Sequence, residues 1–591
     1  MTFLLVSQDV QQETLLVAGV AGLSLVVFGI LCYRLTLHRL AAYPGPLLAR
    51  LTDWVTVYQT STGDRHLDQL KEHNKYGSIV RIGPNTLSFN TISAVKAIYT
   101  NRQGNVRKAP WYTVIEASAG NANSIHAEVD RNVHASHRRV MEHAFTDKSL
   151  RASEVLLVQN VQTFRDIILR TRESDKDWSG PFNMSQWSTY LNYDIMGDLV
   201  FGRRFNVMTS DAHRSVPRLL MNSTAFIYTF ASMPFKAFCR ILLASGVLGL
   251  PVIGGTMAKD DRKFYQYAEH VLEERIATEQ NSSTTRKDIM HYLLHATDPL
   301  TGKGFSREQL QVESSLLIAA GADTTSLTLA AALFYLVHNP RVKHTLVEEL
   351  QSVCSSEDWD QISPSKLISL PYLRAVVDET LRLSPPVPSS LPREVLKGGI
   401  TIDGNYVSEG TVVGVSAYAI HRNSDYFPEP ETFYPERWIP TNCDNPTPSS
   451  LSNVPRTRDS VALARQAFVA FSQGSRGCIG RQLAYYELHT ALALLLYRFD
   501  IRLARDPLTQ KPVKDSTDWR EGLVGVMDPK EEKGVKKVWR EERTREEQFQ
   551  LFDRFLSDRN GPMVEFKDKV GGQGLQKTRE GYVDAKTTRT A

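Results

Sequence analysis

The chain has 591 residues, a formal net charge of +4, 42% hydrophobic residues and 23% charged residues. These ordinary values exclude a disordered, fibrous or multi-span membrane protein and leave room for a large folded core. The mildly basic balance, without a concentrated Lys/Arg stripe, also argues against a nucleic-acid partner.

An apolar run near the N-terminus predicts a membrane span. Residues 15–33 carry no charge over about 19 positions, and a helix of that length crosses a hydrocarbon core of about 30 Å. No convincing small-residue cleavage site follows, which favours a retained anchor over a cleaved signal peptide. Because Arg34 and Arg39 follow the run, the positive-inside rule predicts a lumenal segment 1–14 and a cytosolic body.

The segment 34–46 joins this span to the body and is predicted to be a basic, proline-containing hinge. Pro44 and Pro46 cannot continue a helix and favour extended backbone. Beyond the hinge, residues 78–82 and 86–89 alternate around a Gly-Pro-Asn turn, the pattern of a hairpin with one buried face. A small sheet is therefore expected where the body begins.

Helical periodicity dominates the chain from about residue 129 onward, with short β-like runs such as 411–415 between the helices. The clearest helical segments are 308–338, 372–383 and 483–497. The predicted fold class is therefore mainly α with small β-sheets, preceded by one N-terminal transmembrane helix.

The C-terminal part has a different composition. Residues 528–545 are dense in charges of both signs, which predicts a solvated surface insertion. Residues 563–566 are expected to form a strand. The tail 569–591 is rich in Gly, Lys, Arg and Thr and cannot bury enough apolar area to offset its ordering entropy, so we expect it to be flexible.

Cysteine chemistry depends on one residue. The five cysteines stand singly, so they encode neither a disulfide framework nor a zinc or iron–sulfur cage. Only Cys478 has a special setting, because glycines and Arg476 surround it in a loop just before a predicted helix. Glycines let backbone approach a flat ligand, while the arginine and the helix amides stabilise a thiolate. Taken alone, such a loop is more often the site of an inert cysteine.

The complete spacing resembles that of the cytochrome P450 family, whose haem loop reads Phe-x-x-Gly-x-Arg-x-Cys-x-Gly. The matching positions are Phe471, Gly474, Arg476, Cys478 and Gly480. The resemblance implies that Cys478 is the axial thiolate ligand of the iron in haem b, a ligand that favours cleavage of a bound O–O bond. It also implies one catalytic domain, 47–568, where length alone suggests two or three domains.

A second motif, Ala320-Gly321-Ala322-Asp323-Thr324-Thr325, lies in the middle of the apolar helix 308–338. Gly321 and a back-bonding Thr324 favour a distorted turn with a polar notch, although a solvent-facing polar patch explains these residues equally well. The segment resembles the oxygen-activating stretch of the family. The resemblance implies that Asp323 and Thr324 form a catalytic proton relay.

A third motif concerns structure. Glu379 and Arg382 are three residues apart on one predicted helical face, which by itself is a common surface pair of little energetic weight. The family has such a pair in a buried network with an arginine from a Pro-Glu-Arg segment, and Arg437 matches that arginine. The resemblance therefore implies a structural network whose disruption prevents haem incorporation.

The resemblance also implies partners for the two haem propionates, which need cations or hydrogen-bond donors. Arg476 is one expected partner, and Arg393 and Arg138 are two others. His134 stands where the family often has a tryptophan; histidine can still donate to a carboxylate, and an exposed helix position is the alternative.

The implied reaction inserts one atom of O2 into an apolar C–H bond with two electrons from NADPH. No flavin or nicotinamide motif is visible, so an NADPH–cytochrome P450 reductase is the expected partner, docking near Arg465, Arg476 and Arg481. The expected location is the endoplasmic reticulum membrane, with the catalytic domain in the cytosol. The overall pattern resembles filamentous-fungal members that tailor terpenoid, polyketide or alkaloid metabolites.

Two other classes remain open: a haem-thiolate isomerase or dehydratase that needs no reductase, and a non-enzymatic haem sensor or carrier. Asp323 next to Thr324 disfavours both. A lipophilic small-molecule substrate is expected to occupy an apolar pocket. The expected contacts are Trp111, Tyr112, residues 226–235, Ile318 and residues 387–390.

Overall fold

The computed structural model describes residues 2–569, except for 102–103, 116–121, 173–176, 246–254, 282–285, 354–361, 442–453, 506–544 and 546. The charged stretch predicted at 528–545, apart from Arg545, and the predicted tail after residue 569 therefore lie outside the described residues.

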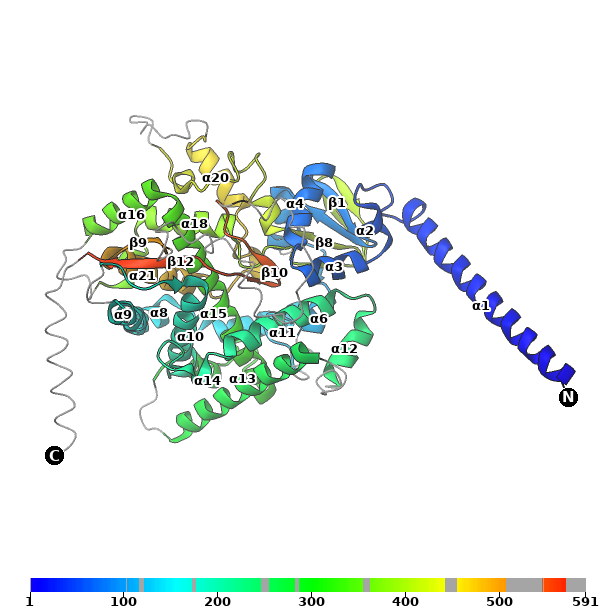
Figure 1. Cartoon of the computed structure of the whole chain (residues 1–591), viewed down its shortest axis with the longest axis horizontal. Helices are drawn as coiled ribbons and strands as arrows, with labels where there is room; N and C mark the ends of the chain where they lie inside the picture. Colours follow the sequence, from blue (N-terminus) through cyan, green and yellow to red (C-terminus); the bar gives the residue numbers. More distant parts are fainter. Residues whose placement is uncertain are drawn as a thin grey trace.

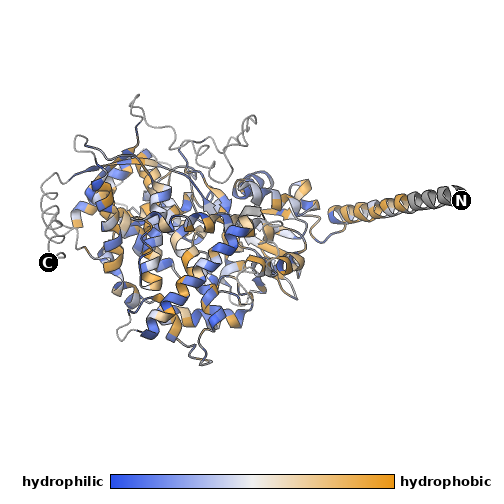
Figure 2. Cartoon of the chain, turned by 60° about the horizontal axis from the view of Figure 1, so that its bottom comes forward, coloured by the Kyte–Doolittle hydropathy of each residue, from blue (hydrophilic) through white to orange (hydrophobic). Residues whose placement is uncertain are grey.

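The N-terminal helix α1 (Thr2–Thr36) extends away from the folded body (Figure 1). Within it, Leu16–Thr36 is long and apolar enough to cross a membrane, and its residues are not buried in the protein. The apolar colouring of this helix in Figure 2 shows the same feature. The candidate span ends three residues later than predicted, because the helix continues through Arg34. The long helix α15 (Arg307–His338) passes the same test, but it is largely buried and belongs to the core.

The segment predicted as a hinge packs against the first hairpin. Arg81 is fully buried and donates hydrogen bonds to the carbonyl oxygens of Arg34 (2.8 Å) and Leu40 (3.3 Å). A Cβ atom on Gly45 would lie only 2.2 Å from the carbonyl oxygen of Arg81, so a side chain at this position would collide with the hairpin. The contacts fix the start of the body against the end of α1.

The largest sheet has five strands in the order β1-β2-β8-β5-β3, and β2 and β8 are parallel. Its first two strands form the predicted hairpin. The predicted strand at 563–566 is also present, within a three-stranded sheet of order β4-β12-β9. The strands are β1 (Ile79–Gly83), β2 (Thr86–Phe89), β3 (Val106–Lys108), β4 (Phe182–Asn183), β5 (Arg393–Val395), β6 (Ile400–Ile402), β7 (Asn405–Val407), β8 (Val412–Val415), β9 (Phe499–Leu503), β10 (Phe552–Arg554), β11 (Leu556–Asp558) and β12 (Met563–Asp568).

Helices make up most of the body, as predicted. Helix α15 runs through its centre, in contact with α10 (Met184–Phe201), α18 (Pro371–Leu383) and α21 (Arg481–Arg498) (Figure 1). It begins with a capping box, in which Ser306 and Gln309 each bond the backbone of the other. The three long helices predicted from periodicity are confirmed to within two residues at each end.

The other helices surround this centre. They are α2 (Leu47–Leu51), α3 (Trp54–Thr62), α4 (Arg65–Tyr76), α5 (Ile92–Val95), α6 (Tyr112–Ile115), α7 (Arg131–Glu142), α8 (Asp147–Ala152), α9 (Glu154–Arg170), α11 (Val216–Ser232), α12 (Lys236–Ala244), α13 (Gly255–Asn281), α14 (Ile289–His295), α16 (Pro340–Val353), α17 (Pro364–Leu367), α19 (Ala417–Ile420) and α20 (Arg458–Ala467), with short turns η1 (Lys96–Thr100), η3 (Asp211–His213), η6 (Pro435–Trp438) and η7 (Gly474–Arg476).

Candidate functional site

The cysteine loop lies between α20 and α21. The backbone N–H of Cys478 donates to the carbonyl oxygen of Phe471 at 2.9 Å, which closes the loop. Gly474 has a φ of +73°, and a Cβ atom there would lie 2.0 Å from the carbonyl oxygen of Tyr99. Glycine is therefore required at this position both for its backbone conformation and for the close approach of η1.

The side chain of Cys478 is accessible because it lies on the wall of an internal cavity of about 370 Å³. Burial among protein atoms raises the pKa of its thiol, while the Gly480 backbone and the cations Arg138 and Arg481 act in the opposite direction. A metal cation bound to the sulfur stabilises the thiolate far more strongly than these groups do. The sulfur thus faces into the cavity and is accessible there.

Helix α15 forms part of the wall of this cavity, which is mostly apolar. Its other lining residues come from several elements and include Ile125, Leu220, Phe264 and Phe555. Among the predicted substrate contacts, Ile227, Tyr228, Val387 and Ser389 line the cavity. Trp111, Tyr112 and Ile318 are buried in the hydrophobic core and are absent from the described cavity wall.

The two predicted relay residues of α15 face different surroundings. Thr324 lies on the cavity wall, and its hydroxyl donates to the carbonyl oxygen of Ala320 at 2.7 Å. Asp323 is absent from the wall, and its Oδ1 atom accepts a hydrogen bond from Nη1 of Arg559 at 2.7 Å in a buried ion pair. Arg559 also donates to Ser326 and, at 3.1 Å, to Thr189. Sequence reasoning did not identify Arg559.

Gly321 has a different role from the one predicted. The structure assigns residues 320–325 to one uninterrupted helix, and Thr324 bonds back to the carbonyl oxygen of Ala320 as predicted. A Cβ atom on Gly321 would lie 2.2 Å from Cε of Met196 on α10. The glycine leaves room for the flexible Met196 side chain where α10 packs against α15.

Glu379, Arg382 and Arg437 come together as predicted, and their side chains are almost fully buried. Arg382 bonds both carboxylate oxygens of Glu379 at 2.9 Å, and Arg437 bonds one of them at 3.0 Å. Burial alone raises the pKa of Glu379, but the two arginines outweigh this effect and bring the pKa to about 2. Trp438 and the backbone of Tyr434 also donate to the carboxylate, so the glutamate is ionised and fully paired.

His421 connects this network to the cysteine loop. Its Nδ1 donates to the carbonyl oxygen of Arg382 at 3.1 Å, and its Nε2 accepts from the backbone N–H of Val469 at 2.9 Å. Burial, together with the charge of Arg382, lowers the pKa of His421 to about 3. The neutral tautomer therefore satisfies both ring nitrogens, and protonation would break the bond to Val469.

The predicted propionate partners gather around Arg476, which is the one among them that lines the cavity. Arg476 lines the cavity and donates to the carbonyl oxygens of Glu128 (2.6 Å), Val129 (3.3 Å) and Asp130 (3.2 Å). Burial and the neighbouring charge of Arg393 lower its pKa to about 10. Two close guanidinium groups thus create a strongly positive potential here.

The other two predicted partners lie beside this pair. Arg138 donates to the carbonyl oxygen of Gly477 at 2.6 Å, directly next to Cys478. His134 is buried, and its pKa falls to about 2 through burial and then through the charges of Arg476, Lys108 and Arg138. His134 is therefore neutral and adds no charge of its own.

Lys108 and His126 also belong to this edge, although no motif identified them. Burial and the charges of Lys108 and Arg393 lower the pKa of His126 to about 3, and His126 lines the cavity. A haem needs one axial ligand, apolar contacts for its ring and cations for its two propionates. The accessible sulfur, the apolar walls and the cationic edge supply a donor set that fits all three requirements.

The three arginines predicted to form a docking face are not equivalent. Arg465 and Arg481 are exposed, whereas Arg476 turns inward to the backbone around residue 129. Arg476 therefore belongs to the cavity edge.

Comparison with known proteins gives consistent matches. The cytochrome P450 family model matches residues 44–531. Cytochrome P450 monooxygenase fscF of Fusarium equiseti is 33% identical over 560 residues, which cover 93% of this chain and 96% of that protein. Cytochrome P450 monooxygenase poxM of Penicillium oxalicum is 35% identical over 483 residues, with coverages of 81% and 87%. Cytochrome P450 monooxygenase apf7 of Gibberella fujikuroi is 34% identical over 561 residues, with coverages of 90% and 94%.

Proposed function

The chain belongs to the cytochrome P450 family and is a haem-thiolate monooxygenase, and from this premise we propose that it hydroxylates an apolar small molecule with electrons derived from NADPH. The observation that carries the proposal is the shared cavity, into which the sulfur of Cys478, the hydroxyl of Thr324 and many apolar side chains all open. The balanced reaction consumes the substrate, O2, NADPH and one proton, and releases the hydroxylated product, water and NADP⁺.

In this proposal Cys478 holds the haem iron, and the bound haem supplies the O2 chemistry. Arg476 binds a propionate at the cavity edge, with Arg393, Arg138 and neutral His134 next to it. Phe471 and Gly480 line the same cavity on the cysteine side, where they contact the ring. The network of Glu379, Arg382 and Arg437 acts indirectly. It is linked through His421 to Val469, where the cysteine loop begins.

Proton delivery is assigned to two adjacent residues of α15. The Thr324 hydroxyl touches the cavity and donates a proton toward the oxygen atom that leaves as water. Asp323 lies behind the wall as a carboxylate paired with Arg559, and when this pair opens it takes up a proton from solvent and passes it to Thr324. Thr324 is thus the residue in contact with the reacting atoms, and Asp323 acts through it.

Electrons are proposed to come from a membrane-bound NADPH–cytochrome P450 reductase. Arg465 and Arg481 are exposed near the cysteine loop and offer positive charge to an acidic docking surface. Reversing the charge with Arg481→Glu should slow reduction and weaken its salt dependence. A rate and salt dependence equal to wild type would rule out this docking face.

The cellular setting is proposed from α1 and from the relatives. The candidate span Leu16–Thr36 would anchor the protein in the endoplasmic reticulum membrane, with the catalytic domain in the cytosol. Since the three relatives are fungal monooxygenases, we place the reaction in the tailoring of a lipophilic fungal secondary metabolite.

The test is reconstitution of the full chain with reductase, NADPH and membranes. Oxygen consumption should depend on an added apolar substrate, and an extract of the producing organism should yield a product with one more oxygen atom by mass spectrometry. A substrate rearranged without loss of NADPH would instead support an isomerase. Haem binding with no turnover of any kind would support a carrier.

A further inference from the structure

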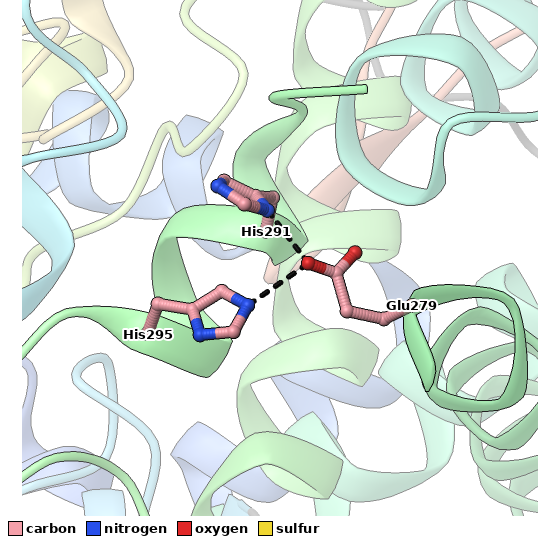
Figure 3. Close-up of side chains that lie close together, drawn as sticks. All are labelled: Glu279, His291 and His295. Atoms are coloured by element: carbon pink, nitrogen blue, oxygen red, sulfur yellow. Dashed lines mark hydrogen bonds and ion pairs between the residues drawn. The ribbon is translucent and has the colours of Figure 1, made fainter. Parts of the chain in front are cut away.

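A cluster of two histidines and one glutamate lies outside the cavity, between α13 and α14. Figure 3 shows His291 and His295 pointing from one helix toward Glu279 on the other. The Oε1 atom of Glu279 lies 2.7 Å from Nδ1 of His291 and 2.9 Å from Nε2 of His295. The two histidines are four residues apart, so successive turns of α14 place them on the same face.

The distances suit a small metal ion. One ligand atom from each of the three side chains lies within 4.8 Å of the others. A tetrahedral zinc ion with bonds of about 2.0–2.1 Å would separate its ligand atoms by roughly 3.3 Å. The side chain of His295 is 59% exposed and has room to move to the spacing that zinc requires. The side chains of Glu279 and His291 are only 11% and 19% exposed. Three protein ligands would leave the fourth position to water.

The surrounding charges permit a cation. Arg275 lies 2.7 Å from the second carboxylate oxygen of Glu279 and makes two hydrogen bonds to Asp288, at 2.9 and 3.1 Å. One arginine is thus shared by two carboxylates, and Arg286 is a second cation that acts on Asp288. Arg275 also fixes Glu279 so that Oε1 faces the histidines, as outer-shell partners orient metal ligands.

Glu279 is ready to act as an anionic ligand. Burial by itself raises the pKa of its carboxyl group, but hydrogen bonds from His295, Arg275 and His291 outweigh burial and lower the pKa to about 2. These three neighbours also hold the carboxylate in its position between α13 and α14.

We propose that Glu279, His291 and His295 form a binding site for a divalent transition-metal ion, with Zn²⁺ as the expected occupant. Imidazole and carboxylate together select zinc, copper or nickel over magnesium and calcium, which prefer sites made only of oxygen atoms. The bound ion would clamp α14 to α13, the helix that supplies Phe264 and Tyr265 to the cavity wall. The ion takes no part in the oxidation itself.

The experiment is a calorimetric titration of chelator-treated holoprotein with Zn²⁺, followed by unfolding scans with and without the metal. Wild type should bind one high-affinity equivalent and unfold at a higher temperature when zinc is present. His295→Ala and Glu279→Gln should each weaken zinc binding by about tenfold or more, as loss of a ligand predicts. His295 is the preferred site for substitution because its side chain is largely exposed and its removal leaves the core packing unchanged.

A matched control is His344→Ala. His344 forms an exposed pair with Glu348 on α16 at 3.4 Å, with no second histidine in the described contacts of this pair. This variant should bind zinc like wild type. Retention of the high-affinity equivalent in His295→Ala, or an equal loss in His344→Ala, would overturn the proposal and identify an adventitious ion only. A thermal shift by Mg²⁺ as large as that by Zn²⁺ would also overturn it.

Discussion

Two buried clusters of charge flank the cysteine loop, and they are balanced in different ways. In the Glu379 network, one carboxylate accepts from two arginines, and backbone carbonyls such as those of His421 and Thr432 accept the remaining guanidinium hydrogens. At the cavity edge, Arg476, Arg393, Arg138 and Lys108 lie close enough to depress the pKa values of their neighbours. The first cluster is a structural unit made from the protein alone.

The comparison shows how charge divides between folding and binding. A buried carboxylate with two arginines and further donors stabilises one conformation, and removing it leaves uncompensated charges. A buried group of cations costs stability, and a ligand with two carboxylates offsets that cost by binding there. The first cluster should therefore matter for folding, and the second for retention of the cofactor.

The largest effect is expected from Glu379→Gln, which would break the self-contained network. Arg382 and Arg437 would lose their anionic partner, at a cost of about 3–5 kcal/mol. We expect little folded protein and almost no haem incorporation, measured by haem content per chain and urea unfolding. Arg151→Ala removes only an exposed pair with Asp147 and should cost less than about 1 kcal/mol. Equal haem content in Glu379→Gln and wild type would refute the structural role.

Next in size is Thr324→Ala, which changes chemistry without disturbing either charged cluster. Loss of a positioned proton donor should lower product formation by about 10²-fold, with peroxide released in place of product. Ser314→Ala is the control, because Ser314 makes the same type of bond to the carbonyl four residues earlier and is absent from the cavity wall. Unchanged product yield per NADPH in Thr324→Ala would disprove the relay.

Arg393→Met tests whether the cationic cluster at the cavity edge retains the haem. The chain should stay folded, because Arg393 hydrogen-bonds Tyr112 and its neighbour's backbone carbonyl, makes ring contacts with Tyr99 and Tyr112, and has no carboxylate partner among the contacts described. Haem affinity should fall by about 1.5–3 kcal/mol, the value of a hydrogen bond to a charged group. Haem transfer to an acceptor protein would measure this loss. Arg107→Met, an exposed change on the neighbouring strand, should leave the transfer rate as in wild type.

The smallest expected effect is on the pH dependence of the free energy of unfolding, through His421. The pKa of His421 is about 3 in the folded protein and 6.5 for an ordinary histidine, so between these values the unfolded chain binds more protons at this residue than the folded one. The free energy of unfolding therefore rises with pH across this window and falls as the pH drops through it. His421→Asn should reduce the slope by about one proton between pH 6 and 4 in urea unfolding. A slope identical to that of wild type would show that another group controls acid loss.

Local periodicity was sufficient for the long helices, and the resemblance of short motifs to the family identified the cysteine loop and the Glu379 pair. Their determining features lie within a few residues of one another, as in the spacing of Phe471, Arg476 and Cys478. Contacts between distant segments were not accessible in this way. Arg559 is 236 positions from Asp323, and no local motif around it suggests a buried ion pair.

Two further cases show the same limit. Gly321 was interpreted from helix propensity, whereas its actual constraint is the side chain of Met196 on another helix. Lys108 and His126 reach the cavity edge because the loop after β3 folds back beside it. In each case the decisive neighbour is set by tertiary packing, which the periodicity of one segment does not encode.

The most direct test of haem ligation by Cys478 is the absorption spectrum of the ferrous carbonyl complex of the purified holoprotein. Ligation of haem iron by the sulfur of Cys478 predicts the red-shifted Soret band of a thiolate complex, and Cys478→Ala should lose this band. Two results would contradict thiolate ligation by Cys478. One is wild-type protein that has a full complement of haem but lacks the band, and the other is a Cys478→Ala variant that keeps it.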